Sequence, residues 1–239
     1  MDIFIPESVH ITHHKGKHTE KLNWLRAGVL GANDGIVSIA GLVMGVAGAT
    51  TSPTIIFAAG TAGIIAGAIS MAVGEYISVS SSKDTEKALL EKEEYRLEHH
   101  PDKELEDLEN IYIEKGLSAA TARKVAEELT AQDASAAHFD ALGIDPKHLT
   151  NPWDAALASA FAFFVGALIP LIVVFLPPQS LRVPVTFFSV VVALVITGVV
   201  SAKVGKANMM RAVLRVVVGG VLAMVVTYSI GRLLHVKGM

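Results

Sequence analysis

Two acidic residues lie inside stretches of sequence that are otherwise apolar enough to cross a lipid bilayer. Asp34, beside Asn33, is seven residues into the apolar run 27–49, and Glu75 is five residues from the end of the run 54–80. Each run is long enough to span a bilayer as a helix. A carboxylate in hydrocarbon costs about 3 kcal/mol by the lower estimates, so it is rare there unless it has a function or a partner. We therefore interpret Asp34 as functional rather than as a residue that only pairs helices.

The two acids are expected at the same depth. Because consecutive spans are antiparallel, Asp34 and Glu75 each lie roughly 8–11 Å from the same membrane face, at about 1.5 Å per helical residue. Met71 is one turn deeper than Glu75, on the same helical face. We expect Asp34, Met71 and Glu75, with the adjacent Asn33, to form a cation pathway. The soft thioether of Met71 favours a transition metal over Ca²⁺ or Mg²⁺.

Stripes of glutamate follow the second span. Residues 83–153 hold 17 Asp and Glu against 9 Lys and Arg, a formal balance of -8, together with four histidines. The glutamates recur every three or four positions, which places each group on one helical face. If the chain folds back at Pro101, the stripes can face each other, as they do in helical bundles that bind two metal ions. The candidate metal ligands are Glu91, Glu94, Glu98, Glu106 and Glu109, with Asp133 and His138 available nearby.

The ligand types restrict the metal but leave an alternative open. Carboxylates with imidazole suit Fe²⁺, Mn²⁺ or Zn²⁺, whereas carboxylates alone would also suit Ca²⁺ or Mg²⁺. The alternative is a solvated acidic face, because the first of these helices also carries Lys87, Lys92 and Arg96. Spacing alone does not choose between the two.

Histidines near the start of the chain present a similar choice. They either belong to a solvated segment that leads into the membrane or form an arm that collects metal, since imidazole binds divalent transition metals. These residues are His10, His13, His14 and His18.

Composition sets the class of protein. The chain has 239 residues, of which 51% are hydrophobic, and its mean hydropathy is +0.48. The apolar residues fall into blocks, which is typical of a membrane protein. Cysteine is absent, which excludes disulfides and thiolate metal sites. No His-Glu-x-x-His motif and no histidine within a span is present to hold a catalytic metal, so we do not expect an enzyme. We also expect no nucleic-acid partner.

Helices must position all of these residues. We predict an all-α integral membrane protein with five transmembrane helices and a cytoplasmic metal-binding domain of three to four helices between the second and third spans. Pro101 should end the first helix of that domain, and Gly116 is a left-handed cap for the second. Ser118 should cap a third helix that ends near Ala131, and a fourth should run over about 133–142. The predicted divisions are a cytoplasmic N-terminal arm (1–25), spans 1 and 2 (26–80), the acidic domain (81–151) and spans 3 to 5 (152–239).

Charge sets the orientation, and glycine suggests the assembly. Lys and Arg concentrate in the N-terminal segment and in the connection between spans 4 and 5, which places the N-terminus and the acidic domain in the cytoplasm. We expect a bacterial inner membrane, or a vacuole-type membrane in a eukaryote. Glycines four apart, at 41 and 45 and at 63 and 67, allow close helix packing within the chain or across a dimer. We expect a homodimer with spans 1 and 2 near its two-fold axis.

Several stretches resemble the vacuolar iron transporter family. They are Gly-Ala-Asn-Asp-Gly-Ile-Val-Ser (31–38), Met-Gly-Val-Ala-Gly-Ala (44–49), Gly-Ala-Ile-Ser-Met-Ala-Val-Gly-Glu-Tyr-Ile-Ser (67–78) and the run from Pro-Trp-Asp to Ile-Pro (152–170). The resemblance covers about residues 23–234. It implies five spans, an acidic cytoplasmic helical domain, a homodimer, and proton-coupled export of Fe²⁺, and sometimes Mn²⁺, from the cytoplasm.

The resemblance also implies roles for particular residues. The family's transmembrane aspartate and methionine fall on Asp34 and Met71, and its cytoplasmic glutamates fall among the five glutamates named above. The family's third metal-binding helix supplies methionine and glutamate. The acidic domain of this chain contains no methionine, and Asp133 or His138 would substitute.

These observations lead to one hypothesis and one alternative of a different class. The hypothesis is a dimeric antiporter of protons and a divalent metal that removes Fe²⁺ or Mn²⁺ from the cytoplasm. The alternative is a membrane-anchored metal buffer or sensor. Asp34 and Glu75 argue against that alternative, because an anchor needs no acids within the membrane.

Overall fold

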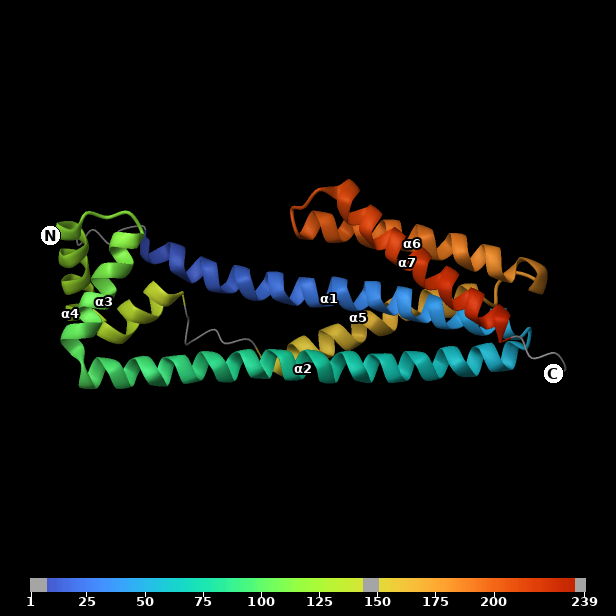
Figure 1. Ribbon diagram of the computed structural model, residues 1–239, viewed down its shortest axis with the longest axis horizontal. Helices are drawn as coiled ribbons and strands as arrows, with labels where there is room; N and C mark the ends of the chain where they lie inside the picture. The colour runs from blue at the N-terminus through green and yellow to red at the C-terminus, as the bar shows by residue number, and fades with distance from the viewer. Residues whose placement is uncertain (1–7, 144–150, 235–239) are drawn as a thin grey trace. The chain divides into compact units, whose positions relative to one another are not determined.

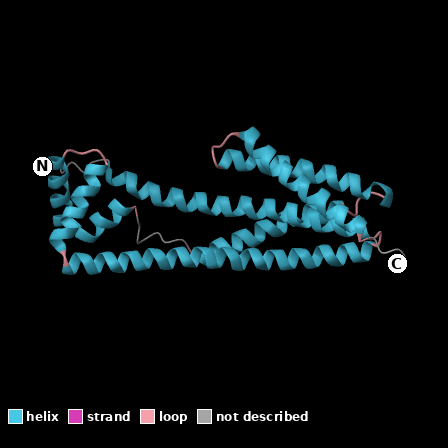
Figure 2. Ribbon diagram, viewed as in Figure 1, coloured by secondary structure: helices cyan, strands magenta, loops and turns pink. Residues whose placement is uncertain are grey.

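The protein is helical throughout the part of the chain that the structure describes. This computed structural model covers the backbone of residues 8–143 and 151–234, while the side chains of residues 8–24 and of Arg26 fall outside the description. The side chains of His10, His13, His14 and His18 therefore lie outside the described residues. Within them are seven α-helices, one 3-10 helix and no strand (Figures 1 and 2), which confirms the predicted all-α class. The elements are α1 (Ser8–Ala49), α2 (Pro53–His99), α3 (Pro101–Glu114), α4 (Ala119–Leu142), α5 (Pro152–Val173), η1 (Gln179–Leu181), α6 (Arg182–Val204) and α7 (Met209–Leu233).

Five of these helices are long and apolar enough to span a membrane, as predicted. They are α1 over Ala27–Ala49, then α2, α5, α6 with η1, and α7. Helix α1 already begins at Ser8, so its apolar part continues a helix that starts in the N-terminal segment. Helix α2 likewise runs on past its apolar part to His99 without interruption.

The helices form two compact units. Among the described residues, one unit, here called the insert unit, contains 8–17, 78–143 and Asn151, and so holds the first turns of α1 and the end of α2 with α3 and α4. The other, the spanning unit, contains 18–77 and 152–234 and so holds most of α1, the apolar part of α2, and α5 to α7.

Helix α1 is central to the core of the spanning unit. On one side its residues Ile39 and Val43 share a hydrophobic cluster with side chains of α2 and α5. Ile36, Ala40 and Met44 belong to a second cluster, with side chains of α6 and α7. Both sides of α1 are therefore covered within one chain.

Glycine lets the backbones of α1 and α5 approach almost to contact. A Cβ atom at Gly35 would collide with the carbonyl oxygen of Phe163, and one at Gly166 would collide with the carbonyl oxygen of Ala32. A Cβ atom at Gly31 would lie 2.6 Å from the carbonyl oxygen of Ser159. This contact brackets the stretch of α1 that carries Asn33 and Asp34.

The glycines of α2 also face helices of the same chain. A Cβ atom at Gly63 would lie 3.0 Å from the side chain of Ile39 on α1, and one at Gly67 would collide with the ring of Phe163 on α5. Of the two close-packing contexts that the sequence left open for Gly63 and Gly67, within the chain or across a dimer, these two glycines therefore make the first.

Local signals position the helices of the insert unit. Pro101 begins α3 directly after His100 and ends α2, as predicted. Gly116 has the left-handed φ of +100° that its cap position requires, and the Ser118 side chain accepts a hydrogen bond from the Thr121 amide at the start of α4. Leu108 of α3 packs with Ala126 and Ala137 of α4 in a small core.

Helix α4 contains a break at Asp133. This residue has non-helical dihedral angles (φ -162°, ψ 100°), and its Oδ1 accepts a hydrogen bond of 2.9 Å from the Ala136 amide. A side-chain acceptor of this kind caps a new helical segment. The predicted third and fourth helices are therefore the two segments of α4, and the break turns the second segment in a new direction.

Replacing Gly35 with alanine should destabilise the spanning unit. The new methyl group has no space beside the Phe163 carbonyl, so α1 and α5 must separate, at a cost of about 1–3 kcal/mol. Thermal unfolding of the detergent-solubilised protein, followed by circular dichroism, would measure this cost. Gly219→Ala on α7 is the matched control, because its Cβ position meets no atom within 4 Å apart from its chain neighbours and its own helix backbone, and alanine favours a helix. Equal melting temperatures for the two variants would contradict the close contact.

Candidate metal site and intramembrane carboxylates

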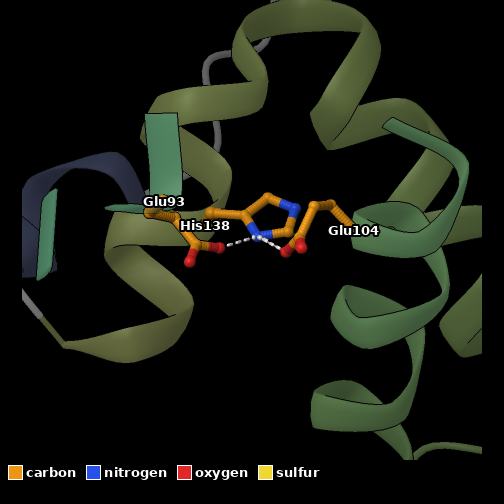
Figure 3. Close-up of side chains that lie close together, drawn as sticks. All are labelled: Glu93, Glu104 and His138. Atoms are coloured by element: carbon orange, nitrogen blue, oxygen red, sulfur yellow. Dashed lines mark hydrogen bonds and ion pairs between the residues drawn. The ribbon is translucent and has the colours of Figure 1, made fainter. Parts of the chain in front are cut away.

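Three helices of the insert unit each contribute one metal-binding side chain to a buried cluster. Glu93 comes from α2, Glu104 from α3 and His138 from the second segment of α4. Figure 3 shows the imidazole of His138 between the two carboxyl groups. The three residues are only 8%, 2% and 2% exposed, respectively. The turn at His100 and Pro101 and the break at Asp133 separate the three helical segments that meet at this cluster.

The ligand atoms of the cluster lie within reach of one metal ion. Nδ1 of His138 is 2.7 Å from Oε1 of Glu93, a hydrogen bond, and 3.9 Å from Oε2 of Glu104. The three ligand atoms all lie within 4.8 Å of one another. Nε2 of His138 is buried and has no hydrogen-bond partner among the described residues. A buried polar atom without a partner is costly, so the cluster has capacity for a further ligand.

The electrostatics of the cluster favour a cation. Burial raises the pKa of Glu104, and the nearby carboxylates of Glu93 and Asp107 raise it further, while Arg96 and His138 act in the opposite direction. Two acids that share a buried site repel each other when both are ionised. A divalent cation would relieve this repulsion. The mixture of carboxylate oxygen and imidazole nitrogen fits Fe²⁺, Mn²⁺ or Zn²⁺.

Sequence reasoning identified one member of this cluster and missed two. His138 was among the predicted ligands, whereas Glu93 and Glu104 were not. A signal for them existed. Glu93 is three residues after Leu90 and Glu104 is four residues before Leu108, so both occur in the apolar pattern of amphipathic helices. An acid in that position becomes buried when the helix packs.

The other predicted ligands lie elsewhere in the insert unit. The three predicted glutamates on α2 and Glu106 on α3 are exposed. Asp133 is also exposed and caps the second segment of α4. Glu109 forms an ion pair of 3.3 Å with Arg123. The structure therefore does not bring the predicted stripes together in the cluster. The predicted ligands outside it are Glu91, Glu94, Glu98, Glu106, Glu109 and Asp133.

The register of α1 against α2 sets the relative levels of Asp34, Met71 and Glu75 along the two helices. Gly60 of α2 faces Val43 of α1, and Gly63 faces Ile39 and Leu42, so the two helices run antiparallel. Continuing this register by about two turns brings Asp34 level with the turn of α2 that precedes Met71. In this register Asp34 is nearer in level to Met71 than to Glu75, which is one turn farther along α2, whereas the sequence analysis expects Asp34 and Glu75 at the same depth.

The local contacts of these intramembrane residues are distinct. Oδ1 of Asp34 accepts a hydrogen bond of 3.0 Å from the hydroxyl of Ser38, one turn along α1. Oδ1 of Asn33 is buried without a hydrogen-bond partner among the described residues. Met71 is partly buried against the cluster that contains Ile39 and Phe163. Glu75 is partly buried one turn along α2 from Met71.

The raised pKa of Glu104 predicts a pH dependence of stability. The folded state holds this proton more tightly than the unfolded state does, so the stabilisation is fully present below the ordinary pKa of 4.5. It is lost as the pH rises through the folded pKa. Glu104→Gln stays neutral and should lack this loss. Unfolding of the full chain with a chelator, between about pH 4 and pH 8, would measure the difference from wild type.

Glu106→Gln is the control for this prediction. It removes an acid from the same helix at an exposed position and should follow the wild-type curve. If Glu104→Gln also keeps the wild-type slope of stability against pH, burial does not raise the pKa of Glu104.

Comparison with known proteins gives a consistent result. The model of one family, described as the VIT family, matches residues 25–232. A protein named vacuolar iron transporter from Acanthamoeba castellanii is 42% identical over 222 residues, which cover 91% of this chain and 82% of that protein. Vacuolar iron transporter homolog 5 of Oryza sativa is 36% identical, over 92% of this chain and 84% of its own length. Vacuolar iron transporter homolog 2.1 of Arabidopsis thaliana is 34% identical, over 93% and 86%.

Proposed function

The chain belongs to the VIT family, and from this premise we propose that it is a multi-pass membrane transporter that exports Fe²⁺, and also Mn²⁺, from the cytoplasm in exchange for protons. The observation that carries the proposal is the buried cluster of Glu93, Glu104 and His138. The relatives are named iron transporters, and this cluster is of the ligand type that binds such a metal.

The insert unit would collect the metal on the cytoplasmic side. Glu93 and Glu104 would bind the ion as carboxylates, and His138 would bind through a ring nitrogen or hold Glu93 in place. Zn²⁺ would bind the same ligands, because borderline metals accept mixed oxygen and nitrogen donors. The exposed glutamates around the cluster would attract cations to this surface.

The spanning unit would provide the pathway. Asp34 would bind the ion when it is ionised and release it when it is protonated, which links metal movement to proton movement at one carboxylate. Met71 at a similar level would favour a transition metal, and Asn33 offers a buried oxygen without a partner among the described residues. Glu75, one turn from Met71, would guide entry.

The assembly and location complete the proposal. We place the N-terminus and the insert unit in the cytoplasm, and the protein in a bacterial inner membrane or, in a eukaryote, a vacuole-type membrane. A homodimer would form through lipid-facing surfaces such as the exposed side of α2, which includes Ile65 and Ile69. The protein would perform transport and not catalysis.

A membrane-anchored metal buffer or sensor is the second candidate. The insert cluster alone would be sufficient for that function, because a buffer binds metal without moving it. The two candidates differ in the spanning unit, since only a transporter needs Asp34.

Metal binding by the cluster is testable on the intact protein. We expect Glu93→Gln, Glu104→Gln and His138→Gln each to weaken Mn²⁺ or Zn²⁺ binding by about tenfold or more, because each removes one ligand of a small set. Isothermal titration calorimetry of the detergent-solubilised chain would give the affinities. Glu91→Gln and Glu94→Gln are matched controls, since both flank Glu93 on α2 and are exposed. Equal weakening in the controls and the cluster variants would indicate a diffuse acidic surface instead of a site.

Transport itself depends on Asp34 in this proposal. Asp34→Asn keeps the shape of the side chain and an oxygen to accept from Ser38, but it cannot ionise. We expect it to abolish Fe²⁺ and Mn²⁺ flux driven by a pH gradient in proteoliposomes. Ser38→Ala removes the hydrogen bond and keeps the carboxylate, so most of the flux should remain. Flux near the wild-type rate in correctly inserted Asp34→Asn would sink the antiport mechanism and favour the buffer.

A further inference from the structure

A cationic side chain stands at the edge of the metal cluster. Arg96 lies on α2, one turn after Glu93, and its Nε is 3.8 Å from Oε1 of Glu104. The other oxygen of the same carboxylate, Oε2, faces His138 at 3.9 Å. The carboxyl group of Glu104 therefore lies between the imidazole of His138 on one side and the guanidinium of Arg96 on the other.

The charges around Glu104 explain why a cation is needed there. Glu93 and Asp107 act against its ionised form, and Arg96 and His138 act in favour of it. An ionised carboxylate that is buried without a positive partner is strongly unfavourable. In the absence of metal, Arg96 supplies a permanent positive charge, because a guanidinium does not lose its proton in proteins.

The side chains of Arg96 and Glu104 differ greatly in their exposure to solvent, and so in their freedom to move. The side chain of Arg96 is 42% exposed, while that of Glu104 is 3% exposed. Arg96 can therefore move its guanidinium into solvent by rotating a long side chain, whereas Glu104 remains in the cluster. A metal ion that binds Glu104 therefore competes with the guanidinium of Arg96, which is attached to the chain but can move away into solvent.

We propose that Arg96 is a tethered counter-cation that competes with the divalent metal for Glu104 and so weakens metal binding at the insert cluster. This inference rests on the proposed function, in which Glu93, Glu104 and His138 bind metal. A metal bound at Glu104 would carry two positive charges close to the guanidinium, and the two cations repel each other. A transporter gains from this competition, because a site that delivers its ion must also release it.

The proposal predicts tighter binding when the charge of Arg96 is removed. Arg96→Gln and Arg96→Met both abolish the charge, and Met retains much of the apolar stem. Each should bind Mn²⁺ and Zn²⁺ about three- to tenfold more tightly than wild type, because the metal no longer has to displace an ion pair or approach a cation. Arg96→Lys keeps the charge and should stay within about twofold of wild type.

Two controls separate a local competitor from a general change in charge. Lys92→Gln and Lys103→Gln remove the same charge at exposed positions next to Glu93 and Glu104 in the sequence. Their affinities should also stay within about twofold of wild type, because exposed charges are screened by solvent and salt. Tightening in these controls equal to that in Arg96→Gln would overturn the role of Arg96 as a competitor.

The experiment is calorimetric titration of the full chain in detergent with MnCl₂ and with ZnCl₂, together with melting curves of the metal-free variants. Unchanged or weaker binding in Arg96→Gln and Arg96→Met, with both variants folded, would overturn the proposal. A merely structural Arg96 would lower the melting temperature of the metal-free protein without tightening metal binding.

Glu93→Gln, measured beside these variants, keeps the two proposals apart. If it binds metal as tightly as wild type, the cluster is not the metal site and both proposals fail. If it binds weakly while Arg96→Gln binds like wild type, the metal site stands and only the competitor role fails.

Discussion

The close contact between the backbones of α1 and α5 is the constraint on which the spanning unit depends. At Gly31, Gly35 and Gly166 a side chain has no room, so these positions bring the two helices together and set their register. Such contacts are a main source of helix association in lipid, where apolar side chains gain nothing by leaving their solvent. Asn33 and Asp34 lie within this contact stretch. The position of the intramembrane acid is thus a result of backbone packing.

The insert unit faces a different problem, which is the burial of acids in a small helical core. Its apolar core, built around Leu108, is modest, and beside it lie two buried carboxyl groups. His138 provides one partner through its hydrogen bond to Glu93, and Arg96 provides a second at the solvent edge. A set of apolar side chains would pack there at lower cost. The presence of two acids at such a buried position is therefore an argument for binding a cation.

Helix α2 carries residues of both regions on one uninterrupted element. Met71 and Glu75 lie in its apolar part, and Glu93 and Arg96 lie in its polar part, with no break between them in the helix Pro53–His99. The same helix therefore supplies side chains to the proposed pathway and to the proposed collecting site. This continuity explains why the change from apolar to acidic composition in the sequence does not coincide with a helix end.

The amino-acid sequence by itself determined the helical elements and the residue types from which the function is proposed. Apolar runs with charges at their ends predict the spans, Pro101 and Gly116 predict helix ends, and an acid in an apolar run stands out because of its cost in hydrocarbon. For the acidic segment the sequence left a metal site and a solvated acidic face open, and it included His138 among the candidate ligands. All of these are local properties of the chain, which depend on neighbouring residues and on the solvent.

Only the tertiary structure decided which acids meet. Periodicity shows that glutamates share a helical face, but it does not show whether that face packs or stays in water. The glutamates of the predicted stripes remain exposed, apart from Glu109, which is half-buried and paired with Arg123, while Glu93 and Glu104, set among leucines, turn inward when α2, α3 and α4 pack. Asp133 was predicted as a ligand and is instead the cap that redirects α4 and carries His138 to the cluster. The physical reason is that a ligand set depends on the relative placement of three helices, which no spacing within one helix encodes.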